Sequence, residues 1–488
     1  MFIDKILSNR QNTAYICEED LLTYDELQKY ASSLANYLHE EGSSPVMIYG
    51  HKNPLMIVCF LACLMAGRAY IPCDTCIPKT RIEEIIEISG AKIVLCTEKL
   101  NINGVRFLDK DEIISICLAN KPYHFYSMNI NMDSDAYVMF TSGSTGSPKG
   151  VRITYSNLEN FIKWFVEISA VKETSPRIIL NQAVFSFDLS IADVYYSMIS
   201  GATLYTINRN VQQDYNLLFS ALKHSNAQMA VITPLFAEMC LCDEGFSEKL
   251  LPFLKVIFFC GEVLKPVTVR KLFNRFPNLR IINAYGPTEA TCSVTCVEIT
   301  KEMTEYTQLP VGEISSSAVN IIIIGENGET LSDSEEGQIM LCGKSVSKGY
   351  CSTKSPLFVS TNEGQCYYTG DIGYIENGYL YFVSRKDEMV KYKGYRIELG
   401  DIENNLCKIT GVKQAAVMVE FSSDGKAKSL TAYILCEQNF DRKTIKEKAQ
   451  LYLPIYMIPK SFRFVDEMPI NSNGKLDKSK LIRRNTYA

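Results

Sequence analysis

Residues 137–151 read YVMFTSGSTGSPKGV, an apolar run followed by a loop of small and hydroxylated residues. Positions 141–150 hold three Gly, three Ser, two Thr, one Pro and a single cation, Lys149. Such a segment cannot pack in a core, because it has almost no apolar groups. Gly residues let the backbone approach an anion, and hydroxyl and amide groups donate to phosphate oxygens. The sequence therefore predicts a phosphate-binding loop between a buried strand and a helix-containing segment.

An ordinary polar surface loop is the alternative interpretation of the same residues. The Walker pattern G-x-x-x-x-G-K-[ST] is not met, because Pro148 precedes the lysine and Gly150 follows it. Ten consecutive residues of this composition directly after a buried strand favour a phosphate-binding loop over a surface loop.

Short apolar runs alternate with helical patterns around this loop. Residues 21–41 carry apolar side chains at helical spacing, and Thr23 with Glu26 forms the sequence pattern of a capping box. The short apolar runs end in Gly or are followed by polar residues, and they indicate buried strands. Because they alternate with helices, we expect these strands to pair in parallel. These runs lie at 45–50, 91–96, 178–184, 202–207, 229–234, 256–261 and 280–286.

The pattern changes near residue 305, where strands separated by Gly and Asn turns predict a β-rich section that ends near 385. A shorter stretch of mixed helix and strand follows. We therefore expect an α/β fold with parallel or mixed sheets flanked by helices. The predicted domains are a large N-terminal core, 1–386, with a β-rich subdomain at about 305–386, and a small, mobile α+β domain, 387–488.

Composition limits the classes of function. The 488 residues are 47% hydrophobic and 22% charged with a net charge of −5, which is typical of soluble globular proteins and argues against nucleic-acid binding. The longest apolar run, 54–67, is shorter than the roughly 20 residues of a membrane span. The N-terminus lacks the pattern of a signal peptide. We expect a cytoplasmic protein without membrane insertion.

The 17 Cys are scattered and mostly lie in apolar runs, where a thiol behaves as a small hydrophobic group. They indicate a reducing compartment and free thiols. The pair Cys73 and Cys76 lacks the additional ligands that a zinc site requires.

Six motifs in register make the chain recognisable. YVMFTSGSTGSPKGV resembles the phosphate-loop motif of the adenylate-forming superfamily, which includes acyl- and aryl-CoA synthetases, luciferases and peptide-synthetase adenylation domains. The other five also resemble motifs of that superfamily, in the same order along nearly the whole chain. They are LMAGRAYIPCD (64–74), NAYGPTEAT (283–291), YYTGDIGY (367–374), SRKDEMVKYKGYRIELGDIE (384–403) and NSNGKLDKSKL (471–481).

The resemblance implies that a carboxylate attacks the α-phosphorus of ATP and displaces pyrophosphate. Such a site needs cations and oriented donors where charge develops. Thr288 would hold the α-phosphate, Glu289 would bind Mg²⁺, and Lys475 would bridge the carboxylate and the nucleotide as the catalytic lysine. The residues implied in gripping the β- and γ-phosphates are Thr141, Ser142, Gly143, Ser144, Thr145, Gly146 and Lys149.

Further ATP-binding residues follow from the same resemblance. Tyr285 offers a face for adenine, Asn283 can read its edge, and Asp371 with Arg385 would hold the ribose hydroxyls. Ala284 and Gly286 complete the adenine motif.

The second half-reaction transfers the acyl group to a thiol. By resemblance, the C-terminal domain rotates about a hinge at Asp387, so that Lys475 leaves the site and the loop 391–396 approaches. Lys393, Gly394, Tyr395 and Arg396 of this thiolation loop would run beside the phosphopantetheine arm of a carrier protein.

Asp188 in FSFDLSIADVY stands where amino-acid-activating members keep a carboxylate for the substrate ammonium. An N-cap of the following helix is the alternative role, since Asp is a good cap. Acyl- and aryl-CoA synthetases lack this Asp, so it favours an amino acid substrate. A CoA ligase and a non-catalytic nucleotide-binding protein are the competing classes.

Three stretches resemble the members that load D-alanine onto a carrier protein for teichoic acid: 45–74, 232–241 and 258–264. Cys260 matches the cysteine that walls their small side-chain pocket. Ala192 stands where a bulkier Met is expected, and Ala284 where Thr is expected, so a larger amino acid is a rival substrate. The other predicted lining residues are Leu189, Thr233, Phe258, Gly261, Cys292 and Ser293.

Overall fold

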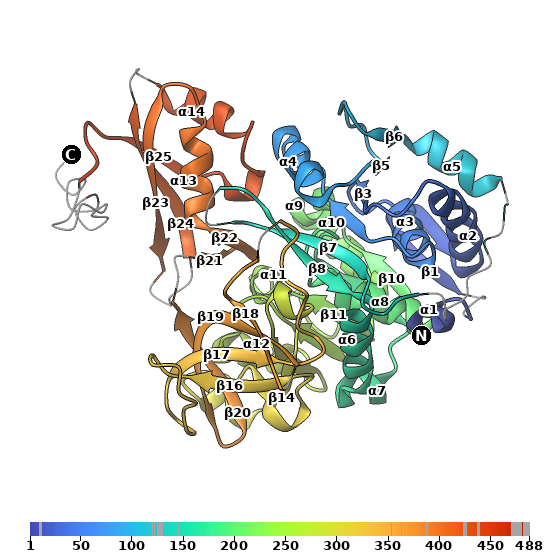
Figure 1. The fold of residues 1–488 in the computed structure, drawn as a ribbon. Helices are drawn as coiled ribbons and strands as arrows, with labels where there is room; N and C mark the ends of the chain where they lie inside the picture. Colours follow the sequence, from blue (N-terminus) through green and yellow to red (C-terminus); the bar gives the residue numbers. More distant parts are fainter. Residues whose placement is uncertain are drawn as a thin grey trace. The chain divides into compact units, whose positions relative to one another are not determined.

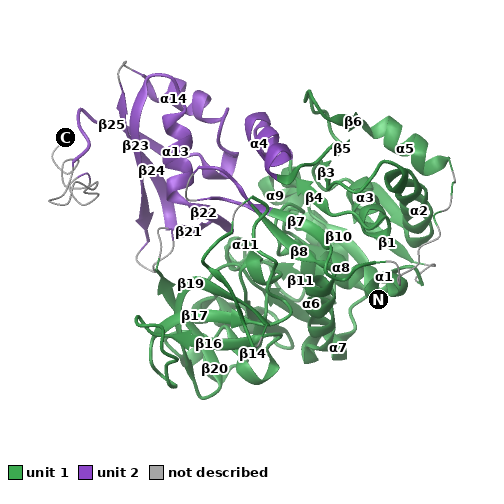
Figure 2. Cartoon of the chain, viewed as in Figure 1, with its two compact units in different colours: residues 1–74, 89–139, 150–386 green, residues 75–88, 140–149, 387–488 purple. Residues whose placement is uncertain are grey.

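The chain divides into two compact units (Figure 2). The first comprises residues 1–74, 89–139 and 150–386, and the second comprises 75–88, 140–149 and 387–488. The expected domains, 1–386 and 387–488, remain a prediction, and they differ from the two units in where the two short segments belong. The computed structural model describes residues 1–8, 12–119, 121, 123, 130–143, 146–352, 354–362, 364–386, 389–422, 427–436, 440–469 and 481.

One sheet of the first unit has the strand order β14-β13-β12-β11-β9-β10-β1-β2. Figure 1 labels β14, β11, β10 and β1 of this sheet. Neighbours from β13 to β1 are parallel, and β14 and β2 add an antiparallel strand at each edge. The runs predicted as strands between 178 and 286 are β9 to β13, so their parallel pairing is confirmed. The bounds are β1 (Thr13–Cys17), β2 (Asp20–Thr23), β9 (Ile178–Asn181), β10 (Thr203–Thr206), β11 (Met229–Ile232), β12 (Val256–Phe259), β13 (Arg280–Tyr285) and β14 (Thr295–Ile299).

Both faces of this sheet are buried. Successive side chains of a strand point to opposite faces, and successive residues of β12 belong to different hydrophobic clusters. In β12, Val256 and Phe258 belong to one hydrophobic cluster, whereas Ile257 and Phe259 belong to another. The first cluster includes side chains of α6 and α8, and the second includes side chains of α10, α11 and α12. This double burial explains why the strands read as continuous apolar runs.

A second sheet has the order β6-β5-β3-β4-β7-β8, with β6, β5, β3, β4 and β7 parallel. The runs predicted at 45–50 and 91–96 are β3 and β5, which confirms both. The bounds are β3 (Val46–Tyr49), β4 (Tyr70–Cys73), β5 (Ile93–Cys96), β6 (Arg106–Leu108), β7 (Asp135–Thr141) and β8 (Lys149–Thr154).

The predicted β-rich section forms an antiparallel sheet of the order β15-β20-β19-β17-β16, with β18 paired to β19. The bounds are β15 (Gly312–Glu313), β16 (Asn320–Ile324), β17 (Gly337–Cys342), β18 (Phe358–Thr361), β19 (Gly364–Glu376) and β20 (Tyr379–Arg385).

This sheet corrects the expectation of free thiols. Cys342 of β17 lies directly opposite Cys366 of β19, and the two sulfurs form a disulfide. The residues are 24 positions apart, and only the pairing of their strands brings them together. A spacing of this length carries no sequence signal, which is why the sequence analysis missed the bond.

The helices of the first unit begin and end with ordinary local signals. Thr23 caps α2 and forms the predicted capping box with Glu26, which confirms that prediction. Asn53 caps the buried helix α3, which occupies most of the apolar run 54–67. The bounds are α1 (Phe2–Ile6), α2 (Tyr24–Glu40), α3 (Pro54–Met65), α5 (Lys110–Leu118), α6 (Tyr155–Glu167), α7 (Ser169–Thr174), α8 (Ser190–Ser200), α9 (Arg209–Gln213), α10 (Tyr215–Ser225), α11 (Pro234–Cys240) and α12 (Pro266–Arg275). Short 3₁₀ helices include η2 (Thr288–Ala290) and η4 (Ile314–Ser316).

The second unit combines a hairpin, a small sheet and helices around its own hydrophobic cluster. The sheet has the order β23-β24-β25, with the first pair antiparallel and the second parallel. The bounds are α4 (Lys79–Ser89), β21 (Met389–Tyr392), β22 (Tyr395–Glu398), α13 (Leu399–Cys407), β23 (Val412–Phe421), β24 (Ala427–Cys436), α14 (Arg442–Ala449), η5 (Ile455–Met457) and β25 (Ser461–Phe464).

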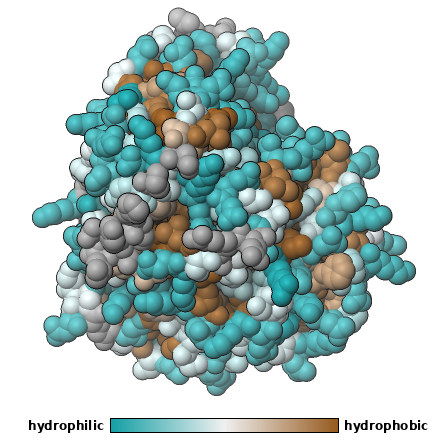
Figure 3. All heavy atoms as spheres, turned by 90° about the vertical axis from the view of Figure 1, so that its right-hand side faces the viewer, coloured by the Kyte–Doolittle hydropathy of each residue, from teal (hydrophilic) through white to brown (hydrophobic). Residues whose placement is uncertain are grey.

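The surface is mostly polar. In the view of Figure 3, hydrophilic side chains cover most of the molecule and hydrophobic ones occur in small groups. Some apolar side chains, such as Leu21 and Leu118, are exposed. Single exposed apolar residues are normal for globular proteins. Among the described residues, no helix combines the length and the apolar character that crossing a membrane would require.

Candidate active site

The glycine-rich loop leaves β7 at Thr141 and enters β8 at Lys149. A strand therefore follows the loop directly, and the predicted helix is α6, which begins at Tyr155. The predicted order of a buried strand, a loop and a helix-containing segment is present. Ser144 and Thr145 of the loop lie outside the described residues.

Two glycines of the loop are required by its geometry. A Cβ at Gly143 would lie 2.1 Å from the carbonyl oxygen of Ser147, so no side chain fits there. Gly146 has a φ of +82°, a left-handed conformation that glycine adopts without strain. The N–H of Gly146 donates to the carbonyl oxygen of Gly143 over 3.0 Å and closes a tight turn.

Within the second unit, the hairpin β21–β22 contacts this loop. The hydroxyl of Ser142 donates to the carbonyl oxygen of Arg396 over 2.9 Å and accepts from the N–H of Glu398 over 3.1 Å. The Nζ of Lys149 lies 3.9 Å from a carboxylate oxygen of Glu398. The structure thus brings the predicted thiolation loop to the predicted phosphate loop.

The turn of this hairpin has the conformation that its sequence predicts. Lys393 and Gly394 have φ values of 54° and 82°, so both central residues are left-handed, as in the turns that favour glycine. The pair Tyr392 and Tyr395 closes the hairpin, and the ring of Tyr395 stacks on that of Tyr456 with centroids 3.9 Å apart. This stacking holds Tyr395, one of the predicted thiolation residues, in place.

A buried ion pair joins two helices of the second unit. Arg81 of α4 donates to both carboxylate oxygens of Asp401 in α13, over 3.1 Å and 2.7 Å. Both side chains are buried. Asn405 donates to Asp401 over 2.8 Å and to the carbonyl oxygen of Gly146 over 3.0 Å. The glycine-rich loop is therefore linked through Asn405 to a rigid, charged pair.

The predicted ribose-binding carboxylate is held by two partners in the first unit. Asp371 of β19 lies opposite Arg385 of β20, and the two side chains form an ion pair. The hydroxyl of Tyr285 donates to the other carboxylate oxygen of Asp371 over 2.6 Å. Burial and the neighbouring carboxylate raise the pKa of Tyr285, which keeps it a hydrogen-bond donor. The two partners thus fix the orientation of the carboxylate.

Alternation along β13 separates two groups of predicted site residues. Asn283 and Tyr285 point to one face, and Ala284 points to the other. Asn283 is buried, and its Nδ2 donates to the carbonyl oxygen of Pro310 over 2.7 Å. Recognition of an adenine edge by Asn283 would therefore use its oxygen or would replace this contact.

The segment after β13 forms a compact loop around Glu289. A Cβ at Gly286 would lie 2.5 Å from the Cα of Ser293, so glycine is needed where the two ends of the loop meet. Thr291 and Cys292 have φ values of 62° and 70°, an unusual pair of left-handed residues that is typical of functional loops.

The carboxylate of Glu289 is buried and accepts a hydrogen bond of 2.8 Å from the hydroxyl of Tyr350. A buried carboxylate oxygen is a ligand that Mg²⁺ prefers. Among the described residues, no group of three or more His, Cys, Asp or Glu could hold a metal by itself. The donor set fits Mg²⁺ only when substrate phosphates supply further oxygens, which is the usual arrangement for this ion.

Asp188 does not cap α8. The residue at the N-cap position is Leu189, and no side chain caps the helix. The carboxylate of Asp188 instead accepts a hydrogen bond of 2.5 Å from the hydroxyl of Thr288. The structure therefore brings together a residue assigned to the amino acid and a residue assigned to the α-phosphate.

The predicted lining of the amino-acid pocket comes from the ends of neighbouring elements. All of these residues are buried except Thr233 and Gly261, which are partly buried. Burial, Asp188 and Cys260 raise the pKa of Cys292, so this wall is a neutral thiol. The set comprises Leu189 and Ala192 at α8, Thr233 before α11, Phe258, Cys260 and Gly261 at β12, Ala284 in β13, and Cys292 and Ser293 before β14.

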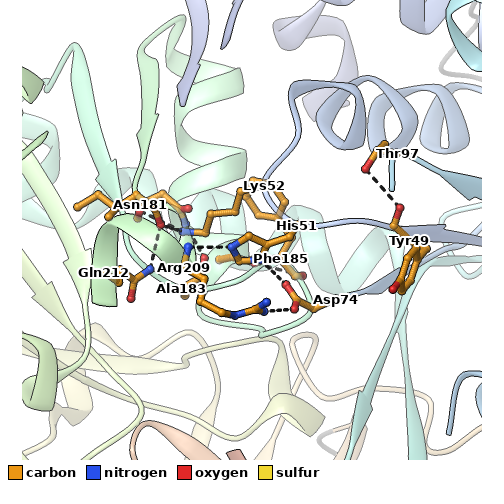
Figure 4. Close-up of polar contacts among 12 residues, drawn as sticks. Tyr49, His51, Lys52, Asp74, Thr97, Asn181, Ala183, Phe185, Arg209 and Gln212 are labelled. Carbon is orange, nitrogen blue, oxygen red and sulfur yellow. Dashed lines mark hydrogen bonds and ion pairs between the residues drawn. The ribbon is translucent and has the colours of Figure 1, made fainter. Parts of the chain in front are cut away.

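A buried polar network, which the sequence analysis missed, supports α8 (Figure 4). Asn181, which Figure 4 labels, lies at the end of β9. It donates to the carboxylate of Asp193 in α8 over 2.7 Å. The ammonium of Lys52 donates to the carbonyl oxygens of Asn181, Gln182 and Ile207 over 3.3, 2.9 and 2.8 Å. Burial lowers the pKa of Lys52 to about 7 and raises that of Asp193 to about 8.

The network continues through His51, which follows β3. The N–H of Arg209 donates to His51 Nε2 over 2.9 Å, so the proton of the neutral ring resides on Nδ1. That Nδ1 lies 2.6 Å from the carboxylate of Asp74, which also pairs with the Arg209 side chain (Figure 4). The network joins the carboxyl ends of strands from two sheets and thereby fixes the helix that carries Ala192.

Lys475 and Asp387, the predicted catalytic lysine and hinge, lie outside the described residues. Their roles stay predictions from the motifs.

Two family models match the chain. The model described as AMP-binding enzyme matches residues 4–351, and the model described as AMP-binding enzyme C-terminal domain matches residues 401–475.

One curated relative and two solved structures illustrate the similarity. A D-alanine–D-alanyl carrier protein ligase of Bacillus licheniformis is 41% identical over 487 residues, covering 96% of this chain and 95% of the relative. The Vibrio cholerae adenylation domain AlmE, in complex with glycyl-adenosine-5′-phosphate, has a TM-score of 0.83 at 23% identity and covers 100% and 97% of the two chains. An o-succinylbenzoate CoA synthetase of Bacillus subtilis has a TM-score of 0.84 at 20% identity, with coverage of 99% and 98%. At these identities the two structures show a shared fold.

Proposed function

The chain belongs to the AMP-binding enzyme family, and on that premise we propose that it activates D-alanine with ATP and transfers it to a carrier protein. The observation that carries the proposal is Asp188, a half-buried carboxylate within electrostatic reach of the small, neutral side chain of Cys292. An ammonium group needs such a carboxylate, and a methyl side chain needs small walls. The 41% identical relative, which is named a D-alanine–D-alanyl carrier protein ligase, supports the same substrate and acceptor.

In the first half-reaction, a carboxylate oxygen of D-alanine attacks the α-phosphorus of ATP. The bond between the α-phosphorus and the bridging oxygen breaks, and pyrophosphate leaves with the electron pair. Asp188 holds the ammonium, and Asp371 with Arg385 orients the ribose. Lys475 supplies the positive charge that the two approaching anions require. Glu289, together with phosphate oxygens, would hold Mg²⁺, and the ion would supply positive charge beside the phosphates.

In the second half-reaction, the thiolate of a carrier-bound phosphopantetheine attacks the carbonyl carbon of the adenylate. A thioester bond forms, the bond from the carbonyl carbon to the phosphate oxygen breaks, and AMP leaves. The hairpin that carries Lys393 and Gly394 contacts the phosphate loop through Arg396 and Ser142, which supports a role of this hairpin beside the pantetheine arm. We infer that adenylation and transfer use two different orientations of the C-terminal domain, which rotates about the hinge at Asp387.

A larger amino acid is the second candidate substrate. Ala192 and Ala284 are both buried pocket residues and both are smaller than the side chains expected in D-alanine-loading members. Each missing methylene-sized contact is worth roughly 0.8 kcal/mol. The pocket would then hold alanine more loosely than a side chain that fills the space.

Amino-acid-dependent exchange of labelled pyrophosphate into ATP tests the proposal. The panel contains D-Ala, L-Ala, Ser, Cys, Val and an aromatic amino acid, with a fatty acid and an aryl acid added for the CoA ligase alternative. We expect the highest kcat/KM with D-Ala. Exchange only with the acyl or aryl acids would overturn the proposal in favour of a CoA ligase, and no exchange with any acid would indicate a non-catalytic nucleotide-binding protein.

The proposed acceptor has its own test. AMP release in the presence of D-Ala should depend on a phosphopantetheinylated carrier protein and should stop when the carrier lacks its prosthetic thiol. We place the reaction in the cytoplasm, because it consumes ATP.

A further inference from the structure

A cavity of about 360 Å³ lies in the first unit outside the residues that any motif predicts. It is bordered by β13, β14, the end of α6 and the turn η4. Its lining combines apolar side chains with three carboxylates. The residues that matter here are Trp164, Glu167, Ile282, Cys296, Glu298 and Glu313.

Strand register places this cavity beside the amino-acid pocket. In the antiparallel pair of β13 and β14, Ala284 lies opposite Cys296, and Ile282 lies opposite Glu298. Directly opposed residues point to the same face of a sheet, and alternation puts both pairs on one face. Ala284 is a predicted wall of the amino-acid pocket, whereas the other three residues line the cavity. Cys296 therefore adjoins the pocket on one side and borders the cavity on the other.

The surroundings of the Cys296 thiol agree with this position. Cys296 belongs to the same hydrophobic cluster as Cys260 and Ala284, and 6% of its surface is exposed. Burial raises the pKa of Cys296 to about 12, and Glu313, Cys260 and Glu298 each add to the shift. The thiol is thus within electrostatic reach of the pocket wall Cys260 and of two carboxylates of the cavity.

We propose that Cys296 is a specificity-determining residue that separates the amino-acid pocket from this cavity and so limits the length of the substrate side chain. The proposal rests on the proposed function, because it concerns the same pocket. A shorter residue at 296 would join the two spaces and admit unbranched side chains. At the border, Glu298 is paired with Arg280 and Glu167 with Lys172. The enlarged space therefore favours neutral end groups over charged ones.

Two variants test the partition, Cys296→Gly and the milder Cys296→Ala. Pyrophosphate exchange is measured with D-Ala, D-norvaline, D-ornithine and D-glutamate. We expect kcat/KM for D-norvaline, relative to D-Ala, to rise by about 10-fold or more, the usual effect of methylene-scale changes in a pocket. The ratios for D-ornithine and D-glutamate should rise less, because each carries a charged end group into a space bordered by apolar side chains and ion pairs. Cys117→Ala is the control, because it removes an equally buried thiol from α5.

The melting temperature of each variant separates a specificity change from a folding defect. If Cys296→Gly fails to fold, Cys296→Ala carries the test. An unchanged ranking of amino acids in a folded variant would overturn the role of Cys296. The same shift in Cys117→Ala would also overturn it. Neither result would affect the proposed function. A wild type that exchanges with no amino acid would overturn the proposed function, and this inference with it.

Discussion

The hydroxyl of Thr288 donates a hydrogen bond of 2.5 Å to the carboxylate of Asp188. One residue belongs to the loop that carries Glu289, and the other precedes α8. The contact links the segment assigned to the α-phosphate with the segment assigned to the amino acid. The hydroxyl is neutral, so this hydrogen bond does not supply the positive charge that a substrate ammonium group would bring to Asp188.

Asp188→Ala should therefore weaken amino-acid binding far more than ATP binding. Loss of one partner of a buried charge pair costs about 3–5 kcal/mol, so KM for the amino acid should rise by at least two orders of magnitude, by roughly 1.4 kcal/mol for each tenfold. Pyrophosphate exchange with one substrate varied at a time measures both constants. Thr288→Val is the matched comparison, because it removes the hydroxyl and keeps the charge. A nearly unchanged KM for the amino acid in Asp188→Ala would rule out ammonium binding by Asp188.

Lys475→Ala should abolish adenylate formation and leave thiol transfer from a supplied adenylate nearly intact. The reason is that the lysine is needed where two anions meet, whereas the thiolate attacks an activated carbonyl. The two half-reactions are measured separately, as pyrophosphate exchange and as AMP release from synthetic D-alanyl adenylate. Lys478→Ala, three residues further along the same motif, is the control. Equal loss in both half-reactions would refute the division of labour.

Local patterns predicted the parts of this structure that depend on neighbours in the sequence. The capping box of Thr23 and Glu26 and the buried run that became α3 both follow from residues within one helix. The segment after the glycine-rich loop was predicted only as helix-containing. The strand β8, which precedes its helix, was not predicted. The strand order could not be deduced from the sequence, since β1 pairs with β10, a strand that lies far away in the sequence.

The missed features depend on contacts between distant residues. Lys52 follows an apolar strand and looks like a surface lysine, yet it is buried against carbonyl oxygens more than a hundred residues away. Cys342 and Cys366 meet only through strand pairing. For Asp188, the sequence left cap and ligand-binding roles open, and the partner Thr288 lies 100 positions away. Motifs predicted the residues of the site, whereas the fold decides which other residues each of them contacts.

The buried pair of Arg81 and Asp401 should contribute more to stability than an exposed pair between the same helices. Arg81→Ala leaves a buried carboxylate without its cation and should cost about 3–5 kcal/mol. Lys408→Ala removes the exposed contact of Lys408 with Glu84, which is 2.8 Å long, and should cost at most about 1 kcal/mol. Denaturant unfolding of the three proteins measures the difference. Equal costs would contradict the importance of burial.

The network around Asp193 should make stability depend on pH. Burial raises the pKa of Asp193 from its ordinary value of 3.8 to about 8, so the folded protein binds a proton that the unfolded chain releases. Stability from this group is fully present below pH 3.8 and decreases as the pH rises toward 8. The shift of Lys52 acts above pH 7 and has the opposite sign.

Between pH 5 and 7, the wild type should therefore lose stability relative to Asp193→Asn, by at most about 1.4 kcal/mol per pH unit. Unfolding free energies of both proteins at pH 5, 6 and 7 give this slope. A difference that does not change with pH would mean that Asp193 is already ionised in the folded protein at pH 5.

Ala192→Met should shift preference toward alanine. Ala192 is fully buried at the start of α8, and a methionine there would occupy space that a substrate larger than alanine needs. The expected change is about 1–3 kcal/mol in relative transition-state binding, which is the usual effect of a methylene-scale change in a pocket. Pyrophosphate exchange with D-Ala, L-Ala, Ser, Cys, Val and an aromatic amino acid measures it in the wild type and the variant.

The stability of Ala192→Met gives a second, independent readout of the same space. If the pocket is open beside Ala192, the longer side chain enters it and the melting temperature stays close to that of the wild type. If no space exists, overpacking should cost about 1–3 kcal/mol and lower the melting temperature. A wild type that is already strict for D-Ala, together with a variant that is slower and less stable, would show that Ala192 does not enlarge the pocket. That result would leave D-alanine as the substrate without the larger rival.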